Sequence, residues 1–276
     1  MKNKVMTRVM CFVVCALLCA MAVVGLTGCS EKETDDWAKI EKAGTMKIGV
    51  TIYKPMNYKD DSGKWTGFET EFAEAVCKKL GVKAEFVEID WNSKVIELNA
   101  GNIDCIWNGM TVTDELKASI GLSESYIRNK QVCVIRKADA EKYTSLAAMA
   151  GAAVVAEDGS AGATVAKEDA NLKEKFTPVG KQTDALMEVK SGTADVAVID
   201  IVMAQASVGD NTDYSDLQIV TGVELPSEEY AIGFRKADTA TQAKVKEAID
   251  ALIKDGTLNT IAEKYGLKDR LIANQK

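Results

Sequence analysis

The first half of the mature chain alternates between two hydrophobic rhythms, one typical of strands and one typical of helices. Apolar residues alternate over 46–50 and 82–86, which predicts two strands. They recur every four residues over 68–80, which predicts a helix, and a second helix is expected over 93–100. A short apolar run over 103–106 predicts a third strand. This β-α-β-α-β order predicts a parallel sheet with right-handed crossovers.

The same order of elements returns in the second half of the chain. The predicted elements are a strand over 152–156, a helix after 159–162, a strand over 176–179, a helix over 184–190 and a strand over 196–199. Segments 95–104 and 186–195 also share a local pattern, because in each a glycine precedes an aspartate by three residues and an apolar strand follows. Two similar lobes that face each other would place the ends of their strands across one cleft.

Residues 131–135 and 219–230 bracket the second half and are expected to cross between the lobes. The apolar stripe of the C-terminal segment predicts a helix that packs on the first lobe. The chain is therefore predicted to have an α/β fold of two lobes, each a mainly parallel sheet flanked by helices, joined by a two-strand hinge. Lobe 1 is expected to comprise 45–130 and 227–276, and lobe 2 to comprise 131–226.

Candidate binding residues follow the strand ends, where open α/β sheets bind ligands. Trp107, Gly109 and Thr111 come directly after one strand and are expected to line the cleft. Asn108 serves either the turn alone or a polar group of the ligand. Asp200 ends another apolar strand, where an acid needs a partner or caps the next helix.

The first thirty residues have a different pattern. Three basic residues precede an uncharged apolar run over 9–26, which indicates a secretory signal peptide over 1–28. The alternative is an uncleaved membrane anchor. Residues 26–29 resemble a bacterial lipobox, which implies cleavage before Cys29, lipidation of its thiol and a membrane anchor. Residues 29–44 are expected to form a lipidated, polar tether.

Composition narrows the chemistry further. The chain carries a net charge of −7, and the basic signal peptide hides part of the acidity of the rest, which argues against nucleic acid as a partner. The chain contains no histidine, which excludes Ser-His-Asp and Cys-His catalysis and most zinc sites. Cys77, Cys105 and Cys133 lack metal or disulfide spacing and are expected to be small buried residues. No cofactor or metal is expected.

Several motifs carry a family resemblance over roughly 44–267. They are Gly67-Phe68-Glu69, Gly101-Asn102-Ile103-Asp104, the run from Gly109 to Glu115, Ala194-Asp195 and Tyr230-Ala231-Ile232-Gly233-Phe234. The chain resembles the extracytoplasmic solute-binding proteins of amino-acid ABC transporters, the group of the glutamine- and histidine-binding proteins. The resemblance implies a monomer with a periplasmic-binding-protein-like fold that closes on an amino acid and delivers it to an ABC permease with its ATPase.

The resemblance also implies roles for individual residues. Tyr53 and Trp91 match the aromatic positions that sandwich the ligand in that family. Gly109 and Thr111 match a backbone carbonyl and a hydroxyl that take the ligand's ammonium group. Asp200 matches the carboxylate that pairs with the same ammonium group.

Two departures from the family pattern bear on the ligand. Ser160 and Ala161 match helix-start positions that meet the ligand carboxylate. However, Leu116 stands where the family has an arginine that grips the same carboxylate, and Glu157 stands where the glutamine binder has a lysine. Because unpaired buried carboxylates are costly, a cationic amino acid or an amine without a carboxylate is expected. Arg128 is the alternative source of the missing charge.

Two further functions compete with transport. An enzyme on the same scaffold, similar to the dehydratases that resemble this family, would use Glu157 and Asp200 for acid–base chemistry. A sensory lipoprotein would pass ligand occupancy to a receptor. Glu228 and Glu229, near the second crossing, are expected to be solvated rather than to bind the ligand.

Overall fold

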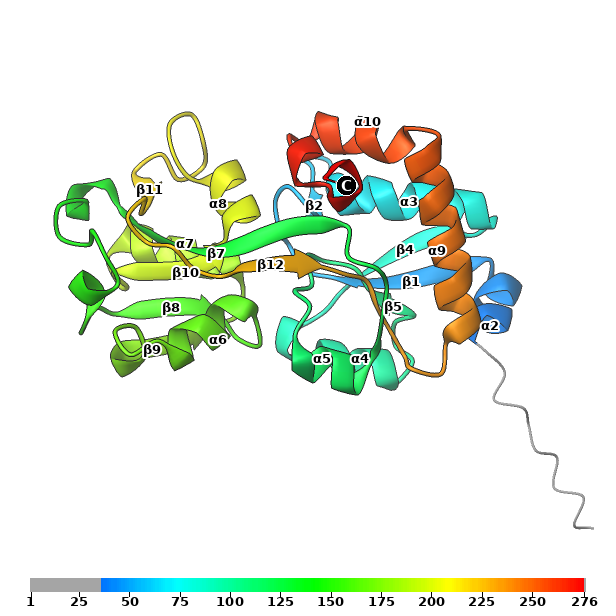
Figure 1. The fold of residues 1–276 in the computed structure, drawn as a ribbon, viewed down its shortest axis with the longest axis horizontal. Helices are drawn as coiled ribbons and strands as arrows, with labels where there is room; N and C mark the ends of the chain where they lie inside the picture. Colours follow the sequence, from blue (N-terminus) through cyan, green and yellow to red (C-terminus); the bar gives the residue numbers. More distant parts are fainter. Residues whose placement is uncertain (1–35, 276) are drawn as a thin grey trace, which may run out of the picture. The chain divides into compact units, whose positions relative to one another are not determined.

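A computed structural model describes residues 36–275, so the predicted signal peptide and Cys29 lie outside the described residues. The first of two main sheets has five strands in the order β4-β1-β5-β13-β6 (Figure 1). These strands are β1 (Thr45–Val50), β4 (Lys83–Glu88), β5 (Cys105–Ile106), β6 (Gly121–Leu122) and β13 (Gly233–Phe234). β1 runs parallel to β4 and β5, whereas β13 is antiparallel to β5 and β6.

Helices and a small hairpin accompany the first sheet, and together we call them the first lobe. The helices are α2 (Asp36–Ala43), α3 (Phe68–Leu80), α4 (Lys94–Asn99), α5 (Asp114–Ser119), α9 (Thr239–Lys254) and α10 (Thr257–Lys264), with short 3₁₀ turns η1 (Trp91–Ser93), η5 (Lys268–Arg270) and η6 (Ile272–Asn274). The hairpin pairs β2 (Tyr58–Lys59) with β3 (Trp65–Thr66). α3 buries the apolar stripe that predicted it and ends at a left-handed glycine, Gly81.

The second main sheet has the order β11-β7-β10-β8-β9, and β12 pairs with β7 beside it. Its strands are β7 (Ile127–Arg136), β8 (Val154–Glu157), β9 (Phe176–Val179), β10 (Val196–Asp200), β11 (Leu217–Ile219) and β12 (Ser227–Tyr230). The helices beside it, which complete the second lobe, are α6 (Ala161–Glu168), α7 (Gln182–Ser191) and α8 (Ile201–Ser207), with the turns η2 (Lys137–Asp139), η3 (Ala147–Met149) and η4 (Lys173–Lys175).

The two sheets have the same plan. Reading β4-β1-β5-β13-β6 against β9-β8-β10-β7-β11 matches every strand, because in each sheet three parallel strands are followed by one strand antiparallel to its neighbours on both sides. The parallel cores confirm the predicted β-α-β-α-β order. The antiparallel strands make both sheets mixed, and they include the chain segments that run between the two sheets.

The longest strand, β7, changes partner part-way along its length. Its residues 127–130 pair with β12, whereas residues 131–136 pair with β10 and β11 in the second sheet. β12 returns the chain to the first sheet through β13. The strand pair β7–β12 is therefore the connection between the two sheets (Figure 1). The predicted second crossing began too early, since residues 217–219 are an edge strand of the second sheet.

The predicted tether extended too far into the chain. Residues 36–43 form the helix α2, and Trp37 and Ile40 are buried in the main core. The two apolar residues, spaced by three, form one turn of an amphipathic face, which is too short a repeat to stand out among charged neighbours.

The three cysteines of the described residues behave as predicted. Cys77, Cys105 and Cys133 are free and buried. Burial raises the pKa of Cys77 and of Cys133 to about 12, so both are neutral thiols at physiological pH. Among residues 36–275, no helix combines the length and the apolar character needed to cross a bilayer.

Candidate functional site

A cavity of about 380 Å³ is lined by residues of both lobes. Nine of the ten binding residues expected from the sequence line it: Tyr53, Trp91, Asn108, Gly109, Thr111, Glu157, Ser160, Ala161 and Asp200. Most of them lie at or just beyond the carboxyl ends of strands, where the two similar sheets were expected to meet. Whether each of them contacts a ligand stays a prediction.

Trp107 is the exception, and the expectation that it lines the cleft is wrong. The side chain is fully buried in the first lobe, and its ring packs edge-on against Phe72 of α3 at a centroid distance of 4.9 Å. Successive side chains along an extended segment point to opposite sides. Trp107 therefore faces α3, whereas the next residue, Asn108, lies at the cavity.

Asn108 is held by hydrogen bonds within the first lobe. Its Oδ1 accepts from Thr51 Oγ1 at 2.7 Å, and its Nδ2 donates to the Thr51 carbonyl at 3.1 Å. Of the two roles left open for Asn108, the structural one is therefore present. The amide fixes the turn at the end of β5 and leaves the neighbouring backbone at the cavity wall.

Gly109 takes a positive φ of 55° at this turn and lies against an aromatic ring. A Cβ atom at this position would lie 2.3 Å from Tyr53 Cε1, so only glycine fits. The Gly109 N–H donates to both oxygens of the buried Glu69 carboxylate at 2.9 Å. Tyr53 is fixed in turn by a 2.7 Å hydrogen bond between its hydroxyl and that of Tyr230.

A pair of carboxylates, Asp200 and Glu228, lies beside the cavity and shares its hydrogen-bond donors. Gln131 Nε2 donates to Asp200 Oδ1 at 2.8 Å and to Glu228 Oε1 at 2.7 Å. The amide of Asn129 donates to both carboxylates as well. Gln182 Nε2 donates to Asp200 Oδ2 at 2.6 Å. Asp200 occupies the N-cap position of α8, but its side chain makes no capping hydrogen bond.

Glu228 corrects an expectation from the sequence, because its side chain is half-buried and hydrogen-bonded within the protein. It accepts a hydrogen bond from Thr111 Oγ1 at 2.9 Å in addition to the shared amides. Burial, followed by the charge of Asp200, raises the pKa of Glu228 to about 7. Burial also raises the pKa of Asp200 above its ordinary value, although the hydrogen bonds that Asp200 accepts lower it. The side chains that donate these hydrogen bonds are amides and a hydroxyl, which carry no positive charge.

A third carboxylate, Glu157, lies at the end of β8 and lines the cavity. Burial and then the charge of Asp200 raise the pKa of Glu157 to about 8, although the charge of Lys94 lowers it. Lys94 is buried, and its Nζ donates to the carbonyls of Trp91 at 3.2 Å and Gly159 at 2.9 Å. Glu157 thus has a cation near it, which the sequence analysis had not foreseen.

Of the residues considered for a ligand carboxylate, those at the start of α6 line the cavity, but no arginine of residues 36–275 does. Ser160 and Ala161 line the cavity at the start of α6, but Ser160 Oγ already accepts from the Ala163 N–H at 3.1 Å. Leu116 lines the cavity with an apolar side chain, in the position matched to the family's arginine. Arg128 does not replace that arginine, because it is exposed and its Nε lies 3.9 Å from Glu229 Oε1.

The arrangement offers a ligand two kinds of surface. One is aromatic and comes from the first lobe, through Tyr53 and Trp91. The other is acidic and comes from Glu157 and Asp200 in the second lobe, with Glu228 of β12 behind Asp200. Within residues 36–275, no cluster of three or more histidine, cysteine, aspartate or glutamate side chains is arranged to hold a metal ion. The site therefore suits an organic ligand with an apolar body and a positive group.

The chain resembles known proteins along most of its length. A sequence profile described as bacterial extracellular solute-binding proteins, family 3, matches residues 46–268. The L-cystine-binding protein of Escherichia coli K12 is 27% identical over 254 residues, which cover 89% of this chain and 92% of that protein.

Two solved structures are similar in fold as well as in sequence. One is an ABC uptake transporter substrate-binding protein from Streptococcus pneumoniae with bound histidine, with a TM-score of 0.79 and 31% identity over 87% of this chain and 100% of that one. The other is an ancestral amino acid-binding protein described as a precursor of cyclohexadienyl dehydratase. It has a TM-score of 0.74 and 31% identity, over 83% and 98% of the two chains.

Proposed function

Because the chain belongs to family 3 of the bacterial extracellular solute-binding proteins, we propose that it captures a cationic amino acid or amine for an ABC importer. One observation carries the choice of ligand: Asp200 lines the cavity and shares neutral hydrogen-bond donors with a second carboxylate, Glu228, just behind it. A positively charged group of the ligand would supply the partner that these two carboxylates lack.

The energetic reason is the cost of burying like charges together. Two carboxylates that share an amide repel each other, and the raised pKa of Glu228 is a consequence of that repulsion and of burial. A cationic group between them would offset both effects at once. The histidine-bound relative from Streptococcus pneumoniae supports a ligand with an amino-acid backbone, and the cavity of about 380 Å³ is of ligand size.

The opposite end of the ligand is less tightly specified. Leu116 offers no hydrogen bond, and the Lys94 ammonium is already directed at two carbonyls. A ligand carboxylate would therefore depend on the start of α6 and on Lys167, the other lysine that lines the cavity. An amine without a carboxylate should bind at least as well as the corresponding amino acid.

We further propose that the two lobes close around the ligand by bending at β7 and β12. Contacts between the lobes mark the closed arrangement: Lys94 Nζ donates to the Gly159 carbonyl, and Lys181 pairs with Glu88 at 2.9 Å. The second pair is partly exposed, so its own contribution to closure is small. A ligand that touches both lobes favours closure by its higher affinity for the closed state.

The location proposed for the protein follows from its first residues. Cleavage before Cys29 and lipidation of its thiol would tether a monomeric binding domain to the outer face of the cell membrane. The segment that carries these features lies outside residues 36–275. Mass spectrometry of the protein expressed in a bacterium would show an acylated N-terminal cysteine if this proposal is correct, and an intact residue 1 if it is wrong.

An enzyme on this scaffold would use the same carboxylates differently. A pKa of about 8 would let Glu157 act as a general acid, and one similar structure is described as a precursor of a dehydratase. A binding protein returns its ligand unchanged. Overnight incubation with each bound compound, followed by chromatography, should therefore recover the compound intact, whereas any product would favour the enzyme.

The ligand proposal is tested by a thermal-shift screen of residues 30–276 with compounds that differ in one group. L-Arginine and L-citrulline have nearly the same shape, but only arginine carries a cationic side chain. Arginine and agmatine differ only in the carboxylate. We expect arginine, ornithine or agmatine to raise the midpoint by mass action and citrulline and glutamate to leave it unchanged. Shifts by glutamate alone would overturn the ligand class while leaving family membership intact.

A further inference from the structure

The binding cavity extends beyond the strand ends. It continues between α5 of the first lobe and α6 of the second. We call this continuation the annex, and six of the residues that line the cavity define it: Val95, Leu116, Ser119, Ala163, Thr164 and Lys167. None of the six is among the binding residues expected from the sequence.

The annex follows one face of each helix. Along α6, the N-cap Ser160, Thr164 and Lys167 are spaced by four and three residues, so they share one face. On α5, Leu116 and Ser119 are spaced by three residues and share a face in the same way. Seven residues of α-helix rise by about 10 Å, so the cavity follows α6 for about that distance. Ser119, Thr164 and Lys167 are exposed, so the cavity opens to solvent at this end.

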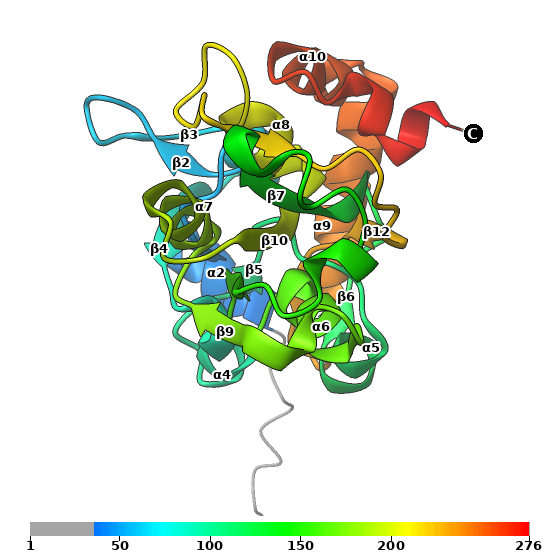
Figure 2. The ribbon, with the colours of Figure 1, turned by 90° about the vertical axis from the view of Figure 1, so that its left-hand side faces the viewer.

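The lobes are joined at other parts of the cavity rim. Lys94 Nζ donates to the Gly159 carbonyl at 2.9 Å, and Lys181, next to α7, pairs with Glu88 of β4 at 2.9 Å. Within the described part of the chain, no hydrogen bond or ion pair joins α5 to α6. Figure 2 shows α5 and α6 on the opposite side of the molecule from α7 and β4. The annex therefore remains open where the rest of the rim is bridged.

The two ends of the cavity differ in charge. α6 begins beside the acidic end, since a Cβ atom on Gly162 would lie 2.9 Å from Gln131 Oε1, and the Gln131 amide donates to Asp200. Lys167 lines the far end, and helical side chains lean toward the start of their helix. Its Nζ lies 3.5 Å from Asp158 Oδ1, but both side chains are partly exposed, so this pair contributes little. A ligand carboxylate can therefore compete for the Lys167 ammonium group.

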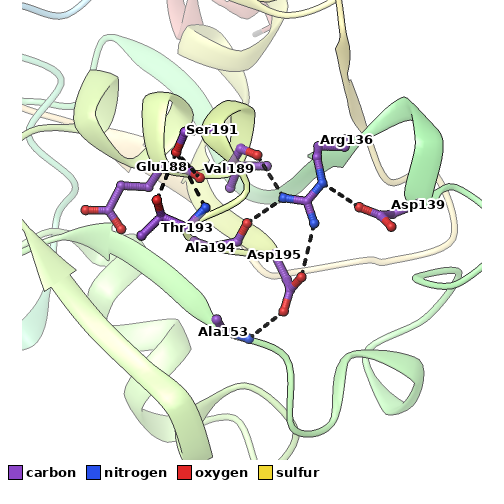
Figure 3. Close-up of polar contacts among 9 residues, drawn as sticks. All are labelled: Arg136, Asp139, Ala153, Glu188, Val189, Ser191, Thr193, Ala194 and Asp195. Carbon is purple, nitrogen blue, oxygen red and sulfur yellow. Dashed lines mark hydrogen bonds and ion pairs between the residues drawn. The ribbon is translucent and has the colours of Figure 1, made fainter.

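Other basic groups are committed elsewhere. Arg136 is the only arginine of the second lobe, and it does not line the cavity. Its contacts are the carbonyls of Val189 and Ala194 and the carboxylates of Asp139 and Asp195 (Figure 3). In the first lobe, Lys94 is directed at two carbonyls, and the charge of Glu115, which also lines the cavity, acts on it. Lys167 is thus the basic group that the annex offers to an anion.

A single amino acid is too short to use both ends of the cavity. Its carboxylate lies about three bonds from its ammonium group, so with the ammonium at Asp200 the carboxylate stays near the start of α6. Leu116 offers no group to hold it there. A dipeptide bound by the same ammonium spans about 7 Å of extended backbone, and the long side chain of Lys167 covers the remaining distance.

We propose that the annex is a second subsite for the carboxyl side of an extended ligand, and that the ligand class includes dipeptides with a basic N-terminal residue. This inference rests on the proposed function, which places the ammonium group at Asp200. The basic residue would occupy the acidic end, and the C-terminal carboxylate would pair with Lys167. A ligand extended on its amino side cannot place both its ammonium group and its basic side chain at the acidic end.

The inference is tested by calorimetry on the protein of the ligand screen with four compounds. They are L-arginine, arginyl-glycine, arginyl-glycinamide and glycyl-arginine. The glycinamide keeps the length of the dipeptide and lacks its carboxylate, and glycyl-arginine contains the same two residues in the opposite order. Arginyl-glycine should bind at least as tightly as arginine and about a hundredfold more tightly than glycyl-arginine.

Lys167→Gln tests the far end of the annex separately. It should weaken arginyl-glycine by about fivefold, the value of a partly exposed ion pair, and leave arginyl-glycinamide unchanged. Lys173→Gln is the matched control, because it makes the same change in net charge at an exposed lysine of the second lobe that does not line the cavity. It should leave both affinities unchanged.

Each outcome decides between the inference and the proposed function. Binding of arginine but not of arginyl-glycine overturns the inference while the proposed function stands. Equal affinities for the two dipeptides also overturn it, because the extension would then have no direction. A Lys167→Gln protein that binds arginyl-glycine normally, or loses the glycinamide equally, excludes a pair between Lys167 and the carboxylate. If glutamate binds and no cationic compound does, the proposed ligand class fails and the inference fails with it.

Discussion

The two lobes have the same framework but contribute different chemistry to the cavity. In both, an aspartate three residues after a glycine accepts an N–H from the neighbouring strand and pairs with an arginine. The strands that follow then diverge at their ends. The first lobe ends its strand in Asn108-Gly109, whereas the second ends its strand in Ile199-Asp200.

This difference separates the parts of the chain that build the lobe from those that choose the ligand. The repeated aspartate–arginine contact holds a helix to the sheet in each lobe. The end of the strand that follows is free to differ between the lobes. The first lobe uses that end for close backbone packing against Tyr53. The second uses it for a buried carboxylate. The repeat therefore explains the fold, and the departures from the repeat explain the site.

The largest expected effect follows from removing the charge at the second strand end. Asp200→Asn should weaken the tightest ligand of the screen by about a hundredfold or more, because the cation would lose its buried partner. The same variant should raise the melting midpoint of the ligand-free protein, since a buried carboxylate is removed. Calorimetry and thermal denaturation measure the two effects.

Glu229→Gln is the matched control for that change. Glu229 lies next to Glu228 but is exposed and near Arg128, so its charge should not matter to the ligand. An Asp200→Asn protein that binds normally would contradict the central role of the carboxylate pair.

At the first strand end, the same comparison predicts a loss of stability. Gly109→Ala places a Cβ atom against Tyr53 and strains a positive φ, which should lower the free energy of unfolding by about 2–3 kcal/mol. Gly101→Ala is the control, because φ is also positive there but no atom lies within 4 Å of the new Cβ. It should cost about 1 kcal/mol. Equal losses in urea denaturation would show that the contact with Tyr53 is not tight.

The carboxylates at and behind the cavity wall, Glu157 and Glu228, should make ligand affinity depend on pH. At pH 7, Glu157, with a pKa of about 8, is mostly protonated without ligand, and a bound cation would favour its ionised form. Binding should therefore release protons, and affinity should rise by about tenfold between pH 6 and pH 9. Calorimetry in buffers of different ionisation enthalpy counts the protons.

Glu157→Gln separates the contributions to this dependence. It should flatten the rise between pH 7 and 9 and leave the part due to Glu228, whose pKa is about 7. A ligand affinity that falls as pH rises would exclude a cationic ligand beside these carboxylates.

The smallest expected effect is on the pH dependence of stability, and it distinguishes the two repeated aspartate–arginine contacts. Hydrogen bonds from Ala153 and Arg136 hold the pKa of Asp195 below its ordinary value, although burial opposes them. Burial raises the pKa of Asp104 above its ordinary value, although the hydrogen bond from the Lys47 N–H lowers it. Ionised Asp195 therefore stabilises the fold above its unfolded-state pKa, and that stability is lost as pH falls through its lower folded-state pKa. For Asp104 the stability is present at low pH and is lost as pH rises through its higher folded-state pKa.

Urea denaturation of Asp195→Asn and Asp104→Asn should show opposite trends. The loss caused by Asp195→Asn should be larger at pH 7 than at pH 3, and the loss caused by Asp104→Asn should be larger at pH 3. If the stability loss of both variants changed with pH in the same direction, the electrostatic environments of Asp195 and Asp104 would be equivalent.

Much of the framework could be predicted from the sequence because it depends on local patterns. Apolar periodicity and glycine stops located the parallel strands and their helices, and the repeated segments pointed to a shared cleft. The failures arose where the outcome depends on tertiary packing. Trp107 lies next to a cavity residue but faces α3. Glu228 looks solvated in sequence, yet β12 places it opposite Asn129 on β7.

Other parts of the site carried a signal that was not used. Lys94 follows Trp91 by three residues, so one helical turn places both on one face at the cavity. Gln182 lies between a predicted strand (176–179) and a predicted helix (184–190), which is a position where ligands bind in open sheets. The amides of Asn129 and Gln131 alternate along β7, but only the structure shows that they meet Asp200.

The central claim is that the cavity selects a positive charge, and calorimetry with L-arginine and L-citrulline tests it most directly. The two compounds fill nearly the same volume and differ in side-chain charge. The account predicts that arginine binds at least a hundredfold more tightly than citrulline to the unaltered protein. Glu157→Gln should remove most of that preference, whereas Asp200→Asn should weaken both compounds, because they share the ammonium group assigned to Asp200. Equal affinities, or tighter binding of citrulline, would contradict it.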